Sequence, residues 1–215
     1  MSRARYIMIG GFLGAGKTTC IASLAQHMTD AGKMVGLITN DQGRELVDTA
    51  MLRAKGFATE EIPGGCFCCR FNSLVDAANK LTEQSRPDVF IAEPVGSCTD
   101  LVATVTYPLR RIYGEDFSIA PLSVLIDPIR AARIFGLSEG GQFSEKVNYI
   151  YRKQLEEADL IIIDTERYAP LAGRLCELVT RSAADRLFAL LMGMGRDTVA
   201  QTVVRGRLVW QRRDP

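Results

Sequence analysis

A glycine-rich segment near the start of the chain limits what this sequence can fold into more than any other feature. Residues 11–19 read Gly-Phe-Leu-Gly-Ala-Gly-Lys-Thr-Thr, which matches the pattern G-x-x-x-x-G-K-[ST]. An apolar run precedes the segment and an amphipathic stretch follows it, so a strand should enter the loop and a helix should leave it. The pattern predicts a loop whose backbone N–H groups surround phosphate oxygens at the start of a helix.

The polar residues of this loop have distinct expected roles. Lys17 should reach the β- and γ-phosphates of a nucleotide, as a binding and catalytic residue, and Thr18 should supply a hydroxyl to Mg²⁺. The other expected phosphate contacts come from Gly14, Ala15, Gly16 and Thr19. The alternative, that the glycines only form a tight turn between strand and helix, leaves the lysine and the hydroxyl unexplained.

Short apolar runs alternate with amphipathic stretches along the rest of the chain. This alternation is typical of an α/β fold with a mostly parallel sheet and helices on both faces. Strands are expected at 6–10, 34–40, 88–93, 122–127, 159–164 and 186–191. Helices are expected at 17–30, 72–85, 99–112, 144–157 and 168–181, with Gly32 ending the first. With a length of 215 residues, the pattern predicts a single P-loop nucleoside triphosphatase domain over residues 1–215.

Four of the expected strands end in polar residues: Asn40 and Asp41, Glu93, Asp127, and Asp164. Because parallel strands share a carboxyl edge, these residues should mark the edge that binds ligands. Asp41 and Glu93 are the expected further Mg²⁺ ligands, directly or through water. Glu93 also begins the sequence Glu-Pro-Val-Gly, a loop expected to approach the γ-phosphate and to take part in catalysis. Taken singly, Asp127 and Asp164 can also be explained as helix N-caps, but this explanation is weaker for all four positions together.

Three of the six cysteines lie within residues 64–69, which read Gly-Gly-Cys-Phe-Cys-Cys. The spacing of Cys66, Cys68 and Cys69 is too tight for ordinary disulfides, and the glycines permit a loop in which three sulfurs converge on one cation. Zn²⁺ is the first expectation, with Co²⁺ and Cu⁺ behind it. The alternative is three buried free thiols, but three within four residues cannot all face one core. Cys98 is expected to be either a fourth metal ligand or a packing residue.

Composition excludes several classes of partner. The 26 basic residues nearly balance the 25 acidic ones, so no general charge attracts the chain to nucleic acid or to an acidic membrane surface. The first apolar stretch is broken by glycines and by Lys17 well before the length of a signal peptide or a spanning helix. We therefore expect a cytoplasmic protein without nucleic-acid or membrane partners.

The ordered set of motifs resembles the CobW-type nucleotide-dependent metallochaperones, relatives of the HypB and UreG nickel-insertion GTPases. The matching segments are 11–19, 37–43 (Leu-Ile-Thr-Asn-Asp-Gln-Gly), 64–69, 93–96, 122–127 and 158–164. The resemblance implies that Lys17 and Thr18 act at phosphate and Mg²⁺, and that Asp41 and Glu93 lie near Mg²⁺. It also implies that the three clustered cysteines bind metal.

Two departures from the family pattern affect these expectations. Where the family carries Asn-Lys-x-Asp to read guanine, this chain has Asp164-Thr-Glu-Arg167, so Asp164 stays an expected nucleotide contact while arginine replaces the guanine-reading carboxylate. A one-residue shift of the loop would let Glu166 substitute, so GTP and ATP both stay open as the nucleotide. The second departure is that a C-terminal domain and a histidine-rich stretch are expected to be absent, since the chain holds one histidine.

The function implied by the resemblance is a Mg²⁺-dependent nucleoside triphosphatase that acts as a metallochaperone or activates a metal- or corrinoid-dependent enzyme. Its partner would be a client metalloprotein or corrinoid enzyme. The sequence does not specify the oligomeric state, and a homodimer is one possibility. Two other functions compete with it. One is a regulatory module that binds nucleotide and metal without hydrolysis. The other is a P-loop small-molecule kinase, for which the sequence shows no obvious lid, although residues 128–147 could supply Arg130 and Arg133.

Overall fold

The computed structural model describes residues 3–40, 50, 52–62, 64–135, 139–140, 143–163, 201–204 and 207–211. The expected helix at 168–181 and the expected strand at 186–191 lie outside the described residues. So do Asp41 and the segment from Asp164 to Arg167.

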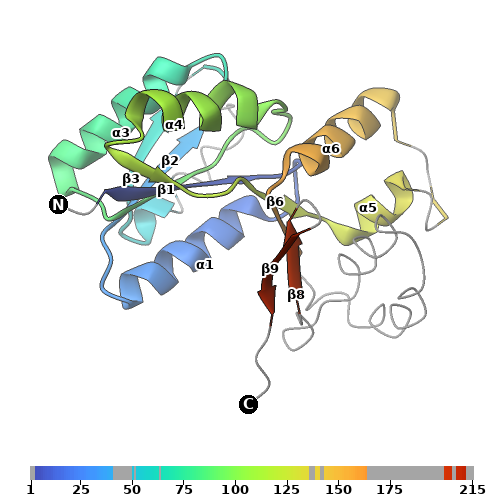
Figure 1. The fold of residues 1–215 in the computed structure, drawn as a ribbon, viewed down its shortest axis with the longest axis horizontal. Coiled ribbons are helices and arrows are strands. Elements are labelled where there is room, and N and C mark those ends of the chain that lie inside the picture. Colours follow the sequence, from blue (N-terminus) through green and yellow to red (C-terminus); the bar gives the residue numbers. More distant parts are fainter. Residues whose placement is uncertain are drawn as a thin grey trace.

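A seven-stranded sheet forms the centre of the molecule (Figure 1). Its strands are β1 (Ala4–Gly10), β2 (Val35–Asn40), β3 (Ala58–Ile62), β4 (Val89–Ala92), β5 (Phe117–Ile119), β6 (Ser123–Ile126) and β7 (Leu160–Ile163). Their order is β3-β2-β4-β1-β6-β7, with β5 also paired to β1, and every pair in this sheet is parallel. The expected α/β fold with a parallel sheet is confirmed.

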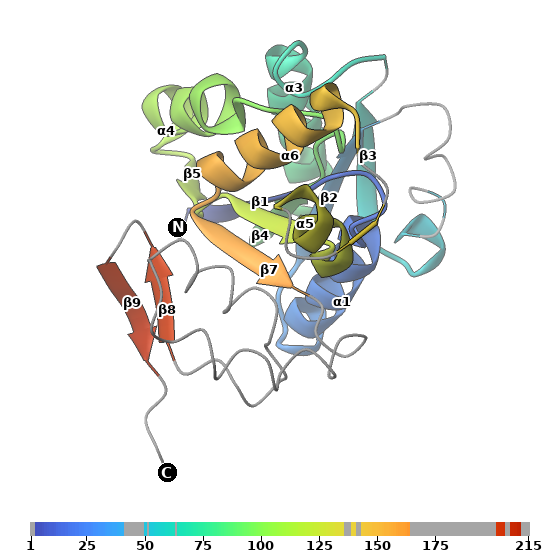
Figure 2. The same cartoon turned by 90° about the vertical axis from the view of Figure 1, so that its right-hand side faces the viewer.

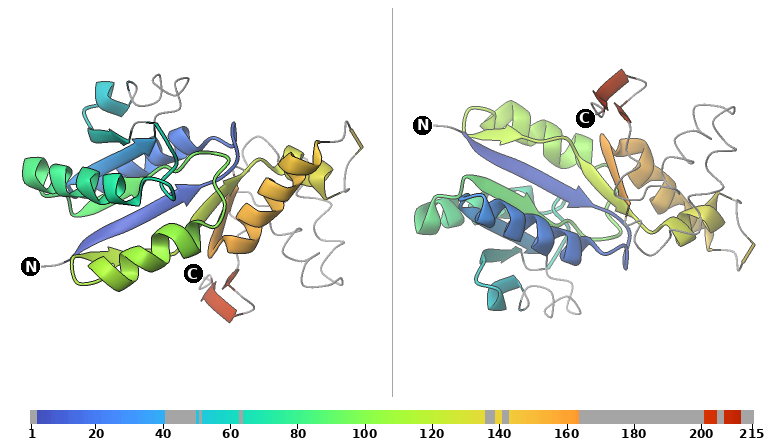
Figure 3. Two further views of the ribbon diagram at one scale, coloured as in Figure 1. Left: turned by 90° about the horizontal axis from the view of Figure 1, so that it is seen from above. Right: turned by 90° about the horizontal axis from the view of Figure 1, so that it is seen from below.

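Helices cover both faces of this sheet, as Figure 3 shows from its two sides. They are α1 (Lys17–Asp30), α3 (Phe71–Ser85), the π-helical turn η1 (Val102–Thr106), α4 (Tyr107–Tyr113), α5 (Pro128–Ile134) and α6 (Glu145–Glu157). Apolar residues of α1 pack with β2 and β4 in one core, whereas those of α3, α4 and α6 pack in a second core on the opposite face. Because both faces of the central strands are buried in these two cores, their sequences are continuous apolar runs.

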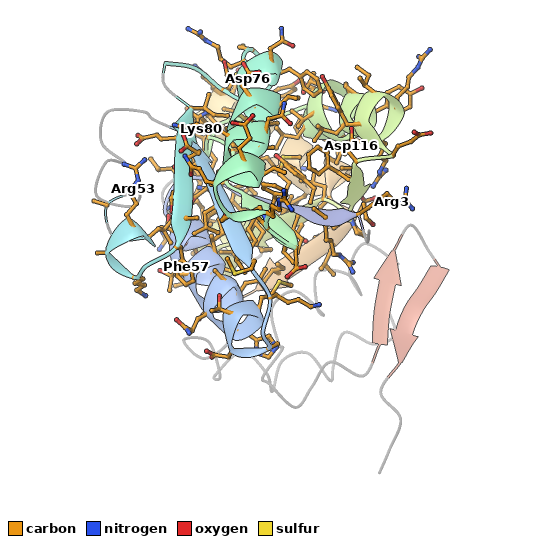
Figure 4. The ribbon with its side chains drawn as sticks, turned by 90° about the vertical axis from the view of Figure 1, so that its left-hand side faces the viewer. Arg3, Arg53, Phe57, Asp76, Lys80 and Asp116 are labelled. Atoms are coloured by element: carbon orange, nitrogen blue, oxygen red, sulfur yellow. The ribbon has the colours of Figure 1, made fainter. Side chains whose placement is uncertain are left out.

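Two strands of the sheet were not expected from the sequence. β3 at the sheet edge reads Ala-Thr-Glu-Glu-Ile, so it has no apolar run from which a strand could be predicted. Lys80 on α3, labelled in Figure 4, forms a 2.7 Å ion pair with Glu60 on β3 and so joins the helix to this edge. β5 has only three residues. The expected helix at 99–112 begins with the π-helical turn, and a separate antiparallel hairpin is formed by β8 (Gln201–Val204) and β9 (Arg207–Gln211).

The central strand β1 brings three loops to one edge of the sheet. Its first residues pair with β5, its last residues pair with β6, and its other side pairs with β4. The loops that follow β1, β4 and β6 therefore leave from adjacent strands at the carboxyl edge, where ligands bind in sheets of this kind. None of the helices in the described part of the chain is both long and apolar enough to span a bilayer.

Candidate nucleotide-binding and metal-binding site

The glycine-rich loop lies between β1 and α1, as its pattern predicted. Gly11 has a positive φ of 139°, and a Cβ at this position would lie 2.3 Å from the carbonyl oxygen of Leu125 on β6. Only glycine fits there, because the loop must pass directly over the neighbouring strand. Helical hydrogen bonding begins at once behind the loop, where the N–H of Cys20 donates to the Gly16 carbonyl at 3.0 Å. The free N–H groups at the start of α1 are thus placed for an anion.

Lys17 and Glu93, which are buried, form a polar group beside this loop with the partly buried Thr18. The ammonium Nζ of Lys17 lies 3.7 Å from Oε1 of Glu93, and the two side chains are only 5% and 9% exposed. The Thr18 hydroxyl donates to both carboxylate oxygens of Glu93 at 3.2 Å. A buried ion pair of this kind is a weak source of stability, because desolvation of both charges opposes their attraction. Because the Lys17–Glu93 pair lies at the end of a phosphate-binding loop, we infer that it serves ligand binding rather than stability.

The oxygens of Thr18 and Glu93 fit a hard divalent cation. Adjacent ligands of an octahedral Mg²⁺ with bonds of 2.0–2.1 Å lie about 2.9 Å apart. The hydroxyl and carboxylate oxygens, 3.2 Å apart, are close to that spacing, and carboxylate and hydroxyl oxygens are ligands that Mg²⁺ accepts. Both residues were expected to act at Mg²⁺. Asp41, the third expected ligand, lies outside the described residues.

The loop that starts at Glu93 presses against the phosphate-binding loop. A Cβ on Gly96 would lie 2.8 Å from the backbone nitrogen of Leu13 and 3.3 Å from Nζ of Lys17. Gln154 on α6 holds this loop in place, since its Nε2 donates to the carbonyl oxygens of Gly96 and Cys98 at 2.9 Å each. Gln154 is buried, and sequence reasoning missed it because nothing local distinguishes it from an exposed helical glutamine.

The cysteine segment forms a tight turn that leads into α3. The backbone N–H groups of Cys69 and Arg70 both donate to the Cys66 carbonyl at 3.0 Å. Phe67 is fully buried in the larger core, so the single apolar side chain of the motif points inward. Its neighbours Cys66 and Cys68 are partly exposed, and Cys69 is exposed. The buried phenylalanine thus fixes a turn that displays three thiols together.

The three sulfurs converge as the sequence predicted. Sγ of Cys66 lies 2.7 Å from that of Cys68 and 3.1 Å from that of Cys69, and the remaining pair is 3.9 Å apart. Two ligands of a tetrahedral Zn²⁺ with Zn–S bonds of about 2.3 Å lie about 3.8 Å apart. The Sγ atoms of Cys68 and Cys69 would need to move slightly away from Sγ of Cys66 to reach this ligand spacing. The donor set therefore fits a soft or borderline cation, with one coordination position left for another ligand.

The thiols differ in their tendency to ionise. Partial burial opposes ionisation of Cys66, but hydrogen bonds with Cys68 and Cys69 outweigh it and hold the pKa of Cys66 below its ordinary value. Burial and the hydrogen bond with Cys66 raise the pKa of Cys68 to about 12, and the hydrogen bond with Cys66 raises the pKa of Cys69. Of the three thiols, Cys66 therefore ionises most readily.

Cys98 extends the sulfur cluster toward the nucleotide side. Cys98 is 6% exposed, and its pKa is raised by burial and by the nearby Cys66 and Cys68. The group whose sulfurs all lie within 4.8 Å of one another consists of the other three. Cys98 thus lies next to the group of three and outside it.

A second contact joins the cysteine segment to the end of β2. Asn40 is buried, and its Nδ2 hydrogen-bonds with the carbonyl oxygen of Gly65, directly before Cys66. Asn40 was expected only to mark the ligand edge of the sheet. The structure brings Lys17, Thr18 and Glu93 together. Two segments lead from this group to the cysteines: the Glu93–Cys98 loop, and β2, whose Ile38 carbonyl accepts from the Glu93 N–H at 2.8 Å and whose last residue, Asn40, bonds to Gly65.

The parallel sheet, the glycine-rich loop and the buried lysine define a P-loop nucleotide-binding domain. Residues 5–184 match the family model described as "CobW/HypB/UreG, nucleotide-binding domain". The chain belongs to this family, as its motifs indicated.

Curated relatives agree with this assignment. The chain is 31% identical over 167 residues to the zinc chaperone YeiR of Escherichia coli, covering 76% of this chain and 47% of that protein. It is 39% identical over 179 residues to the zinc chaperone CobW of a Sinorhizobium species, covering 73% of this chain and 49% of that protein. The chain therefore spans about half the length of the curated relatives it matches.

Solved structures share the fold. A GDP complex of the signal recognition particle receptor FtsY from Elizabethkingia anophelis matches with a TM-score of 0.55 and 15% identity, over 76% of this chain and 49% of that one. A Zn(II)-bound triple mutant of the YjiA GTPase matches with a TM-score of 0.50 and 19% identity, over 84% of this chain and 55% of that one. At these identities the likeness shows the P-loop fold and nothing finer.

Proposed function

We propose that this chain is the nucleotide-binding domain of a Mg²⁺-dependent nucleoside triphosphatase that acts as a metallochaperone for Zn²⁺ or Co²⁺. The observation that carries the proposal is the Glu93–Cys98 loop. Its first residue hydrogen-bonds with Thr18 of the phosphate-binding loop, and its last residue, Cys98, lies beside Cys66 and Cys68, close enough for those thiols to raise its pKa. The names of the curated zinc chaperone relatives support the same function.

In the hydrolysis step, water attacks the γ-phosphorus and the bond to the β–γ bridging oxygen breaks, which gives a nucleoside diphosphate and inorganic phosphate. The N–H groups of Gly14, Gly16 and Thr19 would hold the phosphates in the cradle at the start of α1, whereas the N–H of Ala15, also expected there, donates to the Phe12 carbonyl at 3.1 Å. Lys17 would neutralise charge that develops on the β- and γ-oxygens. Mg²⁺, when bound, supplies further neutralisation of that charge.

The residues of this chain would orient that cation and the attacking water. Thr18 and Glu93 are the proposed Mg²⁺ ligands on the geometry described, and Asp41 and the nucleotide contact at Asp164 remain proposals from the sequence. Gly96 would let the backbone of its loop approach the γ-phosphate, since it already lies against Leu13 and Lys17. Membership of the CobW/HypB/UreG family favours GTP as the nucleotide, while Arg167 argues for weak base selection.

The metal ion is the cargo in this proposal. Cys66, Cys68 and Cys69 would bind it as thiolates, with protons released to solvent on binding. Three protein sulfurs leave a coordination position for a ligand from the client metalloprotein or corrinoid enzyme, which allows transfer without full release. Such a delivery cycle requires a thiol cluster beside a loop that would move with the γ-phosphate, and the Glu93–Cys98 loop lies against the phosphate-binding loop.

The test is phosphate release by the whole chain with Mg²⁺ and either GTP or ATP, together with Zn²⁺ titration against a chromogenic chelator. Hydrolysis without any acceptor and thiol-dependent Zn²⁺ binding are expected. Tight nucleotide binding without phosphate release would instead support the regulatory module. Diphosphate formation only with an added small-molecule acceptor would support the kinase. Equal Zn²⁺ binding by a variant with serine at all three clustered cysteines would rule out the metal site.

A further inference from the structure

Arg130 on α5 reaches back onto the phosphate-binding loop. Asp127 caps this short helix, since its Oδ1 accepts hydrogen bonds from the N–H groups of Ile129 and Arg130 at 2.9 and 3.2 Å. The guanidinium of Arg130 donates from Nη1 to the carbonyl oxygen of Leu13 at 2.5 Å and lies 5.4 Å from the centre of the Phe12 ring. Figure 2 shows α5 in front of the sheet on the side of β7.

The contacts of Arg130 leave its charge without an anionic partner. In the described part of the chain, the ion pairs are Lys17 with Glu93, Lys80 with Glu60, and Lys153 with Glu156, so Arg130 pairs with no carboxylate there. A guanidinium bonded to one neutral carbonyl uses few of its five N–H donors. Its planar fork is suited to two parallel bonds with a phosphate or a carboxylate.

The position of Leu13 identifies which phosphate lies nearest. In a P-loop the helix start holds the α- and β-phosphates, and the lysine reaches the β- and γ-phosphates. A Cβ on Gly96 would lie 2.8 Å from the Leu13 nitrogen and 3.3 Å from Nζ of Lys17. Leu13 therefore lies near the lysine ammonium, which is where the β- and γ-phosphates are expected. A Cβ on Gly14 would lie 3.6 Å from Nη2 of Arg130. The arginine is thus at the γ-phosphate end of the loop.

We propose that Arg130 binds the terminal phosphate of a nucleoside triphosphate and so distinguishes triphosphate from diphosphate. The proposal rests on the nucleotide binding proposed above, and it holds whether or not the nucleotide is hydrolysed. Rotation of the arginine side chain exchanges the Leu13 carbonyl for anionic oxygens, which form stronger, charge-assisted hydrogen bonds. During hydrolysis the same group would stabilise charge on the γ-phosphate oxygens, as arginines supplied from within a chain do in other P-loop enzymes.

The chain contains a matched control for this arginine. Arg152 on α6 also donates to a backbone carbonyl, that of Ile134 at 3.2 Å, and also lies over an aromatic ring, 5.0 Å from the centre of Phe135. These contacts are at the carboxyl end of α5, whereas those of Arg130 are on the phosphate-binding loop. Loss of either arginine removes one carbonyl hydrogen bond and one ring contact, but only Arg130 is placed to meet a phosphate.

The experiment measures calorimetric affinities of the whole chain for a Mg²⁺-bound non-hydrolysable triphosphate and for the Mg²⁺-bound diphosphate. Arg130→Ala should weaken triphosphate binding by about 10- to 100-fold, the range expected for a charge-assisted hydrogen bond, and diphosphate binding by less than about threefold. Arg130→Gln removes the charge but keeps a polar side chain and should show the same loss. Arg152→Ala should leave both affinities unchanged.

Three outcomes would overturn the proposal. Unchanged triphosphate selectivity in the folded Arg130→Gln variant would show that the charge does not meet the γ-phosphate. Equal effects of Arg130→Ala and Arg152→Ala on the two nucleotide affinities would show that Arg130 acts only through packing. Failure of the wild-type chain to bind either nucleotide would overturn the proposed function and this inference together, whereas the first two outcomes would overturn the inference alone.

Discussion

Asn40 at the end of β2 donates a hydrogen bond from Nδ2 to the carbonyl oxygen of Gly65, 2.5 Å away, which joins the strand before Asp41 to the residue before Cys66. Asn40 is 3% exposed, so this bond is made in a dry environment where it is strong. Since the Glu93 N–H donates to the Ile38 carbonyl of β2 at 2.8 Å, β2 with its Asn40 bond and the Glu93–Cys98 loop give the thiol cluster two connections to the proposed nucleotide site.

Nucleotide state should therefore change metal affinity. We expect Zn²⁺ or Co²⁺ to bind the diphosphate-loaded and triphosphate-loaded chains with affinities that differ by about 5- to 150-fold, the usual range of coupling between sites. Linkage requires metal to change the relative affinity for the two nucleotides by the same factor. Asn40→Ala should reduce that factor, because it removes one of the two connections. The measurement is Co²⁺ titration followed by its thiolate charge-transfer absorption.

Equal metal affinities in both nucleotide states would refute this coupling even if both ligands bind. The control is Asn148→Ala, which removes another asparagine bond to a backbone carbonyl, 3.3 Å from the Phe143 oxygen. It should leave the coupling factor unchanged.

Replacement of Lys17 should abolish tight nucleotide binding. The ammonium group is the strongest charge aimed at the β- and γ-phosphates, and the rest of the loop offers only backbone dipoles. Lys17→Ala also leaves the buried Glu93 without its cation, so the unfolding free energy should be measured beside nucleotide affinity. Lys80→Ala removes an ion pair on the exposed edge and serves as the control. Unchanged calorimetric affinity in Lys17→Ala would contradict the assignment of the phosphate site.

Gly96→Ala should weaken binding of the triphosphate more than of the diphosphate. The added methyl group would lie 2.8 Å from the Leu13 nitrogen and 3.1 Å from its Cα, so one of the two loops must move. Gly10→Ala is the matched control, because its methyl group would have no neighbour closer than 3.6 Å. Equal affinities of the Gly96→Ala chain and the wild type for both nucleotides would show that the close approach of these loops is unimportant.

Loss of Gln154 should destabilise the fold and loosen the Glu93–Cys98 loop. Gln154→Ala leaves two buried carbonyl oxygens without their donor, and unsatisfied buried groups cost about 1–3 kcal/mol each. The unfolding free energy from urea titration should fall by at least about 1 kcal/mol. Gln26→Ala, which removes an exposed 2.8 Å bond to Asp30, should change it by less than about 0.5 kcal/mol. A similar small change in both variants would mean that Gln154 does not hold the loop.

Base selection should be weak or should favour ATP. Arg167 stands where the family has its guanine-reading aspartate, and removal of a hydrogen-bond acceptor removes most of the discrimination that it provides. Competition between GTP and ATP for the whole chain measures the preference directly. A strong preference for GTP would show that another acceptor, such as Glu166, replaces the missing carboxylate.

The sequence was sufficient for features that depend on near neighbours in the chain. The loop at residues 11–19, the convergent thiols and the parallel sheet all follow from local spacing and periodicity. Gly32 follows the end of α1 as expected, with its N–H bonded to the Thr29 carbonyl at 2.9 Å. The edge strand β3 was missed because a threonine and two glutamates fill its centre.

Contacts between distant segments could not be read from the sequence. Arg130 and Leu13 lie 117 residues apart, and Gln154 and Gly96 lie 58 apart, so these pairs meet only because β6 and β4 flank β1 and because α6 packs over the loops. Periodicity predicts that a helix has a buried face, but not which loop a polar residue on that face will meet. Residues that position a site are therefore harder to predict than those that perform its chemistry.

The spacing between Glu93 and Cys98 has a consequence for how this domain can evolve. Four residues separate a carboxylate at the phosphate-binding loop from a thiol at the cysteine cluster, and Gln154 fixes the backbone between them. One inserted residue would add up to about 3.6 Å of chain, enough to part Cys98 from Cys66 or Glu93 from Thr18. Surface loops elsewhere accept insertions with little loss of stability. At this loop, selection should act on length as strongly as on the residues themselves.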